Sequence, residues 1–193
     1  MSRFIITILT ILFTFLYGSE GEGKTTHAYV GVDRCKICHE TTEMGNQYAV
    51  WTETAHAKAY ETLLGEEAAK IAQERGLKTP ANEAPECLQC HVTGYNVPDA
   101  EFGKKFDKTK GIQCESCHGP GEKYRRQDIM CDVETAKANG LILPKPEDCL
   151  TCHNENSPKY KPFDYAKYYP KIEHHKNPDY TCDTGDEEED EDW

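Results

Sequence analysis

The sequence predicts a mainly α-helical fold with extensive irregular loops, and three observations lead to this expectation. Helical periodicity is confined to a few stretches, which Pro- and Gly-containing segments separate. The mean hydropathy is −0.76, which leaves a thin apolar core for a chain of 193 residues. Four pentapeptides of the form Cys-x-x-Cys-His punctuate the chain. We therefore expect the chain to wrap around something other than its own side chains.

The Cys-x-x-Cys-His motifs use eight of the ten cysteines and four of the eight histidines, and their first cysteines are 52, 27 and 35 residues apart. This motif attaches a c-type haem through two thioethers, and its His binds the iron as proximal ligand. The predicted thioether residues are Cys35, Cys38, Cys87, Cys90, Cys114, Cys117, Cys149 and Cys152. The predicted proximal ligands are His39, His91, His118 and His153.

Two other kinds of site use closely spaced cysteines. Zinc sites generally combine two Cys pairs per metal and do not require a His after every second cysteine. A disulfide across two intervening residues closes a strained loop. The pattern therefore favours four c-type haems with their iron, and it predicts a multihaem cytochrome c wrapped around a stack of four covalent haems.

A six-coordinate haem needs a second axial ligand, and four histidines outside the motifs are candidates: His27, His56, His174 and His175. His56 lies on the best predicted helix, roughly 43–64, where its alanine neighbours leave room for a porphyrin. Adjacent side chains usually diverge, so one of His174 and His175 is expected to bind iron. His27 is a candidate ligand, either within the chain or to a haem of a neighbouring subunit, and the alternative is an ordinary exposed residue. This arithmetic favours three six-coordinate haems.

Two shorter helices are also expected. One covers about 66–75 and ends at Gly76, a natural C-cap. The other begins after the capping residue Asp132, runs to Asn139 and is stopped by Gly140.

Residues 1–19 have the pattern of a signal peptide: a basic start, an apolar run over 4–17 and two small residues. The run is short for a membrane span, so an uncleaved anchor is the weaker alternative. Export agrees with haem attachment on the far side of the cytoplasmic membrane. We expect a periplasmic protein, with an extracellular location as the alternative, that is not an integral membrane protein after cleavage. In that oxidising compartment, Cys131 and Cys182 are expected to form a disulfide.

The formal charge of −12 becomes −13 when Arg3 leaves with the signal peptide. This charge argues against nucleic acid as a partner and favours redox proteins with a basic docking surface. Residues 20–182 are expected to form one tetrahaem domain. Residues 183–193 carry seven consecutive acidic residues, and a charge run of this kind is typical of a disordered tail.

The chain also resembles a known family in several segments. Thr-Ala-His-Ala-Lys-Ala at 54–59, Cys-Glu-Ser-Cys-His-Gly-Pro-Gly at 114–121, Cys-His-Asn-Glu-Asn-Ser-Pro at 152–158 and the late histidine pair resemble the tetrahaem cytochrome c-554 family over about 29–175. The resemblance implies a mainly helical fold with closely packed haem pairs and one five-coordinate haem. It also implies His56 and one of the late pair as distal ligands.

One departure from the family concerns its other distal histidine, which lies shortly after the Gly-Pro-Gly segment. Residues 122–129 of this chain contain no histidine, and His27 is the candidate to replace it. The leading functional hypothesis is a monomeric electron carrier. The alternatives are a subunit of an extracellular cytochrome filament with a ligand supplied in trans, and a reductase of a small nitrogen oxide at a five-coordinate haem.

Overall fold

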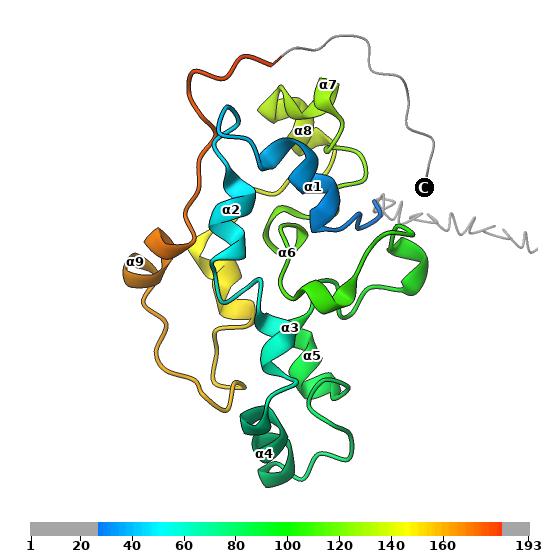
Figure 1. Ribbon diagram of the computed structural model, residues 1–193, viewed down its shortest axis with the longest axis vertical. Coiled ribbons are helices and arrows are strands. Elements are labelled where there is room, and N and C mark those ends of the chain that lie inside the picture. Colours follow the sequence, from blue (N-terminus) through cyan, green and yellow to red (C-terminus); the bar gives the residue numbers. More distant parts are fainter. Residues whose placement is uncertain (1–26, 183–193) are drawn as a thin grey trace, which may run out of the picture.

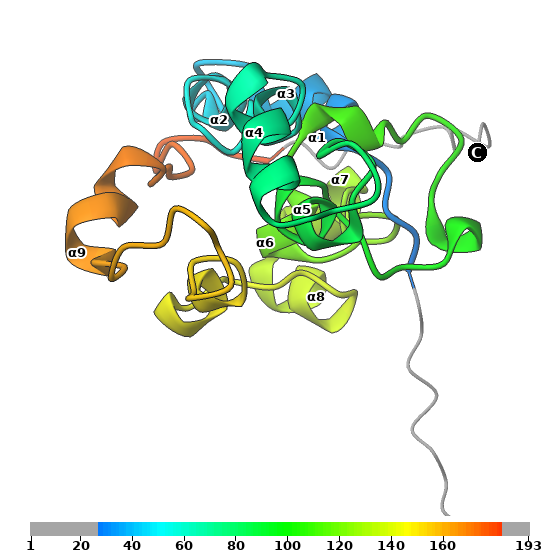
Figure 2. The ribbon, with the colours of Figure 1, turned by 90° about the horizontal axis from the view of Figure 1, so that it is seen from below.

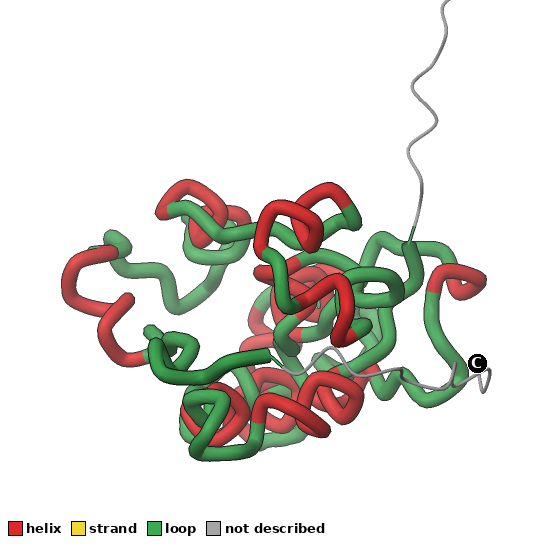
Figure 3. The backbone as a smooth tube through the Cα atoms, turned by 90° about the horizontal axis from the view of Figure 1, so that it is seen from above, coloured by secondary structure: helices red, strands yellow, loops and turns green. Residues whose placement is uncertain are grey.

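The computed structural model describes residues 27–182, in which short helices alternate with long loops (Figure 1). The tube view makes the high share of loop clear (Figure 3). In this part of the chain the one extended pairing is an isolated parallel bridge between Tyr29 and Phe102. The elements are α1 (Val32–His39), α2 (Gln47–Thr52), α3 (Ala59–Thr62), α4 (Glu66–Glu74), α5 (Pro85–His91), η1 (Asp99–Glu101), η2 (Lys108–Lys110), α6 (Glu115–His118), α7 (Gln127–Met130), α8 (Val133–Ala138), η3 (Pro146–Thr151), α9 (Tyr165–Tyr168) and η4 (Tyr169–Lys171).

The mainly α-helical prediction with extensive loops is confirmed. The predicted signal peptide at 1–19 and the predicted acidic tail at 183–193 lie outside the described residues. None of the helices in 27–182 has the length and apolar character needed to cross a bilayer.

The four motifs coincide with helical turns. The first three occupy α1, α5 and α6, and each of these helices ends at the motif histidine. The fourth lies on η3 and the residues that follow it. Residues three and four apart on a helix share one face, so one turn directs both thiols and the imidazole to the same side.

The predicted continuous helix over 43–64 is wrong, because a turn separates α2 from α3. In this turn the Thr54 hydroxyl donates to the Trp51 carbonyl at 2.7 Å. The Ile112 N–H donates to the His56 carbonyl at 3.0 Å, and the Trp51 indole donates to the Ile112 carbonyl at 2.8 Å. These bonds to a distant loop replace helical ones, so tertiary contacts override the helical periodicity. His56 therefore lies in a turn and not on a helix.

The two shorter helices form where the sequence predicts them. α4 is followed by Gly76 at φ +66°, a left-handed conformation that glycine adopts without strain. At the start of α8 the Asp132 carboxylate accepts the Thr135 N–H at 2.7 Å. Gly140 follows that helix at φ +102°. Both predictions are confirmed, because local capping chemistry decides these helix ends.

The polypeptide core is small. The buried apolar side chains of the described residues are Val30, Val32, Ala59, Leu63, Ala72, Ala81, Ala84, Val92, Tyr124 and Ala136, half of them alanines. Meanwhile Ile37 and Leu150, which lie inside the first and fourth motifs, are 62% and 49% exposed. Large apolar side chains next to the motif thiols fit the edges of a porphyrin, which would remove them from water.

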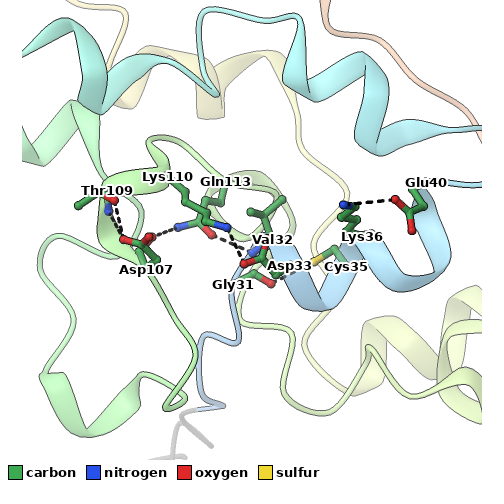
Figure 4. A network of polar contacts seen from close by, with 10 residues as sticks. All are labelled: Gly31, Val32, Asp33, Cys35, Lys36, Glu40, Asp107, Thr109, Lys110 and Gln113. Atoms are coloured by element: carbon green, nitrogen blue, oxygen red, sulfur yellow. Dashed lines mark hydrogen bonds and ion pairs between the residues drawn. The ribbon is translucent and has the colours of Figure 1, made fainter.

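A network of polar contacts holds α1 against the loop that follows η1 (Figure 4). The Gln113 side chain accepts the Val32 N–H at 2.8 Å and donates to the Asp107 carbonyl at 2.9 Å. Lys110 forms an ion pair with Asp33. The first motif is thereby fixed to the segment that leads into the third.

Glu115, inside the third motif, is the buried centre of a second network. Its Oε1 accepts the N–H groups of Val30 and Gly121 at 2.8 and 2.6 Å, and its Oε2 accepts that of Gly31 at 2.8 Å. Burial raises the pKa of Glu115, and the three hydrogen bonds oppose that shift by favouring the charged form. One carboxylate thus joins the start of the domain to the Gly-Pro-Gly turn.

The C-terminal segment lies to one side of the other helices, with α9 at its outer edge (Figure 2). It returns along α2 to the region of α7 (Figure 1). There Cys131 and Cys182 are joined in a disulfide that spans 51 residues of sequence.

Candidate haem-binding sites

The motif thiols are gathered into neighbouring groups. The Cys35 thiol makes a hydrogen bond with Cys114, which brings the first motif against the third. The Cys90 thiol makes one with Cys152, which brings the second motif against the fourth. All eight motif cysteines are free of disulfides. The thiols of the first and third motifs thus adjoin, as do those of the second and fourth, and Cys117 of the third motif also lies near Cys149 and Cys152 of the fourth.

Two of the motif thiols are protonated in their surroundings. Burial is the first cause that raises the pKa of Cys90 and of Cys117 to about 11, so both are protonated thiols at neutral pH. Within residues 27–182, no group of three or more His, Cys, Asp or Glu side chains is arranged to hold a metal ion by itself. The donors instead come as one cysteine pair and one histidine at each motif.

Two motif histidines have the ring orientation that iron binding requires. His91 Nδ1 lies 2.6 Å from the Ala59 carbonyl oxygen, and His118 Nδ1 lies 3.0 Å from that of Ile142. A carbonyl only accepts, so Nδ1 carries the proton in both rings. The lone pair is then on Nε2, which leaves this nitrogen available for iron.

His39 is oriented by a side chain. Its Nδ1 lies 3.1 Å from Oε1 of Gln47, the first residue of α2. The amide nitrogen of Gln47 is occupied by two carbonyl groups, so the oxygen faces the imidazole. His39 therefore also donates through Nδ1 and presents Nε2.

Two of the candidate distal histidines face motif histidines. The ring centres of His56 and His153 are 6.0 Å apart, and those of His118 and His174 are also 6.0 Å apart. An imidazole nitrogen binds a metal at about 2 Å, so two rings on opposite sides of one iron have centres roughly 6 Å apart. Both pairs have the separation that bis-His ligation requires, and the residues present fit the haem.

Burial around three of these rings, those of His56, His118 and His153, favours the neutral imidazole, which is the form that binds metal. Burial lowers the pKa of His56 and of His118, with a smaller contribution from the facing or neighbouring imidazoles. Burial also lowers the pKa of His153, which is stacked on Phe163 with ring centres 4.5 Å apart.

The late histidine pair diverges, as adjacent residues usually do. His174 donates through Nδ1 to the Ile172 carbonyl at 2.8 Å and faces His118. His175 is exposed and its Nε2 lies 3.1 Å from the Glu173 carboxylate. Within this pair the fold thus brings His174 to a motif histidine and leaves His175 at the surface.

His27 takes a different position. Its ring lies beside Gly140, where a Cβ would be 3.0 Å from His27 Cδ2. Among residues 27–182, no ring pairing joins His27, His39 or His91 to a second imidazole, although His39 lies near enough to His118 to contribute to the lowering of its pKa. The described part of the chain thus brings together two of the three ligand pairs that the sequence favours.

Sequence reasoning missed Gln47 and Glu115. Gln47 follows His39 by eight residues, and no motif marks that separation. Glu115 was visible only as a variable residue of the third motif. A buried acceptor with several donors is a tertiary feature, and a single sequence carries no signal for it.

Comparisons with known proteins agree with this geometry. Residues 34–119, which contain the first three motifs, match the family model described as cytochrome c554 and c-prime. The chain is 29% identical over 167 residues to cytochrome c-554 of Nitrosomonas europaea, an alignment that covers 75% of this chain and 67% of that protein.

A second relative is the multiheme cytochrome MtrA of Shewanella baltica, at 30% identity over 80 residues, with 38% of this chain and 24% of MtrA covered. The match therefore spans about a quarter of the length of MtrA. No solved structure matches the chain. The helical fold, the ordered Cys-x-x-Cys-His motifs and these relatives agree: the chain is similar to the multihaem c-type cytochromes of the c-554 family.

Proposed function

We propose that this protein is an exported tetrahaem electron carrier that passes electrons between redox partners. The observation that carries the proposal is the placement of His56 opposite His153 and of His174 opposite His118, both at 6.0 Å. An iron held between two imidazoles keeps its ligands in both oxidation states and has no free position for a substrate, which suits electron transfer.

In this proposal the chain binds four haems, each of which supplies a one-electron iron couple. The thioethers come from Cys35 and Cys38, Cys87 and Cys90, Cys114 and Cys117, and Cys149 and Cys152. The proximal ligands are His39, His91, His118 and His153. The distal ligands are His56 for the fourth motif and His174 for the third, with His27 as the remaining candidate.

In this proposal the polypeptide orients the motif histidines and holds the haem-attachment motifs close together. Backbone carbonyls of Ala59 and Ile142 and the amide of Gln47 hold protons on the Nδ1 side of the motif histidines. Cys35 lies against Cys114, and Cys90 lies against Cys152. These contacts support a close approach of the haem at the first motif to that at the third, and of the haem at the second motif to that at the fourth. Electron transfer between neighbouring haems requires no acidic or basic side chain.

We further propose a periplasmic location after cleavage of residues 1–19, because c-type haem is attached outside the cytoplasm. The charge of −13 that would remain supports a partner with a basic docking surface, and it opposes close self-association, so we propose a monomer.

A potentiometric titration of the purified protein tests the carrier function. We expect reversible uptake of four electron equivalents, with reduction and reoxidation spectra that superimpose. A titration that stops short of four, or a rapid irreversible reoxidation by nitrite or nitric oxide, would contradict a tetrahaem carrier and favour the nitrogen-oxide reductase.

A further inference from the structure

Gln47 makes three hydrogen bonds that join two parts of the molecule. Its Oε1 lies 3.1 Å from His39 Nδ1. Its Nε2 donates to the Met44 carbonyl at 2.7 Å and to the His175 carbonyl at 3.0 Å. The residues at its two ends, His39 and His175, are far apart in sequence and belong to the first motif and to the C-terminal segment.

The orientation of this amide is fixed by its partners. Two carbonyl oxygens surround one end, so that end is the NH2 group. The oxygen at the other end only accepts, and it therefore holds the proton of His39 on Nδ1. In this way Gln47 decides which nitrogen His39 presents to iron.

The same turn also seats the C-terminal segment. The Asn177 N–H donates to the Met44 carbonyl at 3.1 Å. Gly45 has φ +108°, and a Cβ at this position would clash with the His175 carbonyl oxygen. The backbone of 175–177 thus lies directly on the turn, and the residue before it, His174, faces His118 at 6.0 Å.

We propose that Gln47 is a positioning residue for two haem irons: it sets the ligand strength of His39 and it seats the segment that carries His174. The proposal rests on the haem ligation given above. His91 and His118 are oriented by backbone carbonyls, supplemented at His91 by the Thr62 hydroxyl at 3.3 Å. His39 instead donates to a side-chain amide, so a substitution of Gln47 can either remove this hydrogen-bond acceptor or make it stronger.

The two substitutions that follow shift the potential of this iron in opposite directions. Gln47→Leu removes the acceptor, which weakens His39 as a donor to the oxidised iron, so the reduction potential of that haem rises. Gln47→Glu supplies a charged acceptor, which strengthens the ligand, so the potential falls. A residue with only a structural role would shift the potential in the same direction in both variants.

Both variants lose the N–H groups that donate to the Met44 and His175 carbonyls, so in both the segment that carries His174 should be held less firmly. The expected result is a new high-spin signal in the low-temperature EPR spectrum, at the expense of one low-spin haem. Gly45→Ala is the matched variant for the seat, because it pushes against the His175 carbonyl and keeps the amide of Gln47. It should raise the high-spin signal.

The experiment is a spectroelectrochemical titration and an EPR spectrum of the holoprotein and four variants, with Gln73→Leu on the exposed face of α4 as the control. We expect one titration step to move up in Gln47→Leu and down in Gln47→Glu, and none to move in the control. Equal shifts in both Gln47 variants, or unchanged low-spin signals in all three turn variants, would overturn the proposal. A wild-type protein with fewer than four haems would instead overturn the proposed function.

Discussion

The nitrogen that a histidine offers to iron is decided by the hydrogen bond on the other side of its ring. His91 and His118 donate through Nδ1 to backbone carbonyls at 2.6 and 3.0 Å. The His118 ring and the Ile142 backbone form a reciprocal pair, since the Ile142 N–H also donates to the His118 carbonyl at 2.9 Å. Backbone acceptors are independent of side-chain identity, which explains why the motif sequence alone does not reveal them.

His56→Ala should convert one low-spin haem to high spin. Its imidazole faces His153 at 6.0 Å, and no other histidine lies in the turn between α2 and α3 to replace it. Visible and EPR spectra of the purified variant measure the change. A spectrum identical to that of the wild type would remove His56 from the set of ligands.

His174→Ala and His175→Ala form a matched pair of neighbouring substitutions. His174 faces His118, whereas His175 is exposed and lies 3.1 Å from the Glu173 carboxylate. We expect a new high-spin haem in the first variant and wild-type EPR in the second. The opposite result would exchange the roles of the two residues.

Helices whose ends depend on local capping residues could be predicted from the sequence, whereas the helix that tertiary contacts interrupt could not. The capped helices α4 and α8 could be predicted from Gly76, Asp132 and Gly140, because their ends depend on nearby residues. The helix expected over 43–64 could not, because the His56 carbonyl pairs with Ile112 across the fold. That break is also what brings the His56 ring to His153.

The candidate site divides in the same way. The proposed thioether cysteines and proximal histidines could be predicted from the sequence, because the Cys-x-x-Cys-His spacing alone identifies a haem-attachment motif. Which of His174 and His175 faces His118 depends on how the C-terminal segment packs, so the sequence could only predict that one of the two is a ligand. The orientation of the Gln47 amide depends on the Met44 and His175 carbonyls and the His39 ring together, and no sequence pattern marks that combination.

Glu115→Gln tests the element that joins the start of the domain to the third motif. The carboxylate accepts three N–H groups, and the amide of glutamine would place a donor against one of them. An unsatisfied buried group of this kind costs about 1–3 kcal/mol in the free energy of unfolding. Denaturant titration of the holoprotein measures the loss, with Glu74→Gln on the exposed face of α4 as a control within about 0.5 kcal/mol of wild type. A stability equal to that of the control would show that the network contributes little.

At the scale of the whole molecule, the composition and the burial pattern agree. A mean hydropathy of −0.76 goes with a core whose buried apolar side chains are mostly small. Ile37 and Leu150 remain exposed inside the motifs. We therefore propose that porphyrins supply much of the apolar surface that stabilises the fold.

The protein without haem should consequently fail to fold cooperatively. Expression in a host that lacks the haem-attachment machinery provides this form with every residue intact. We expect no cooperative thermal transition by circular dichroism, against a clear transition in the holoprotein. A cooperative melt of the haem-free chain would mean that the polypeptide core suffices.

The central claim is that all four motifs bind haem covalently, and the intact mass of the exported protein tests it most directly. The predicted mass is that of the chain from residue 20 onward plus four haems, with Cys131 and Cys182 in a disulfide and no cysteine left to alkylate. Three or fewer haems with the remaining motif thiols open to alkylation would contradict the account.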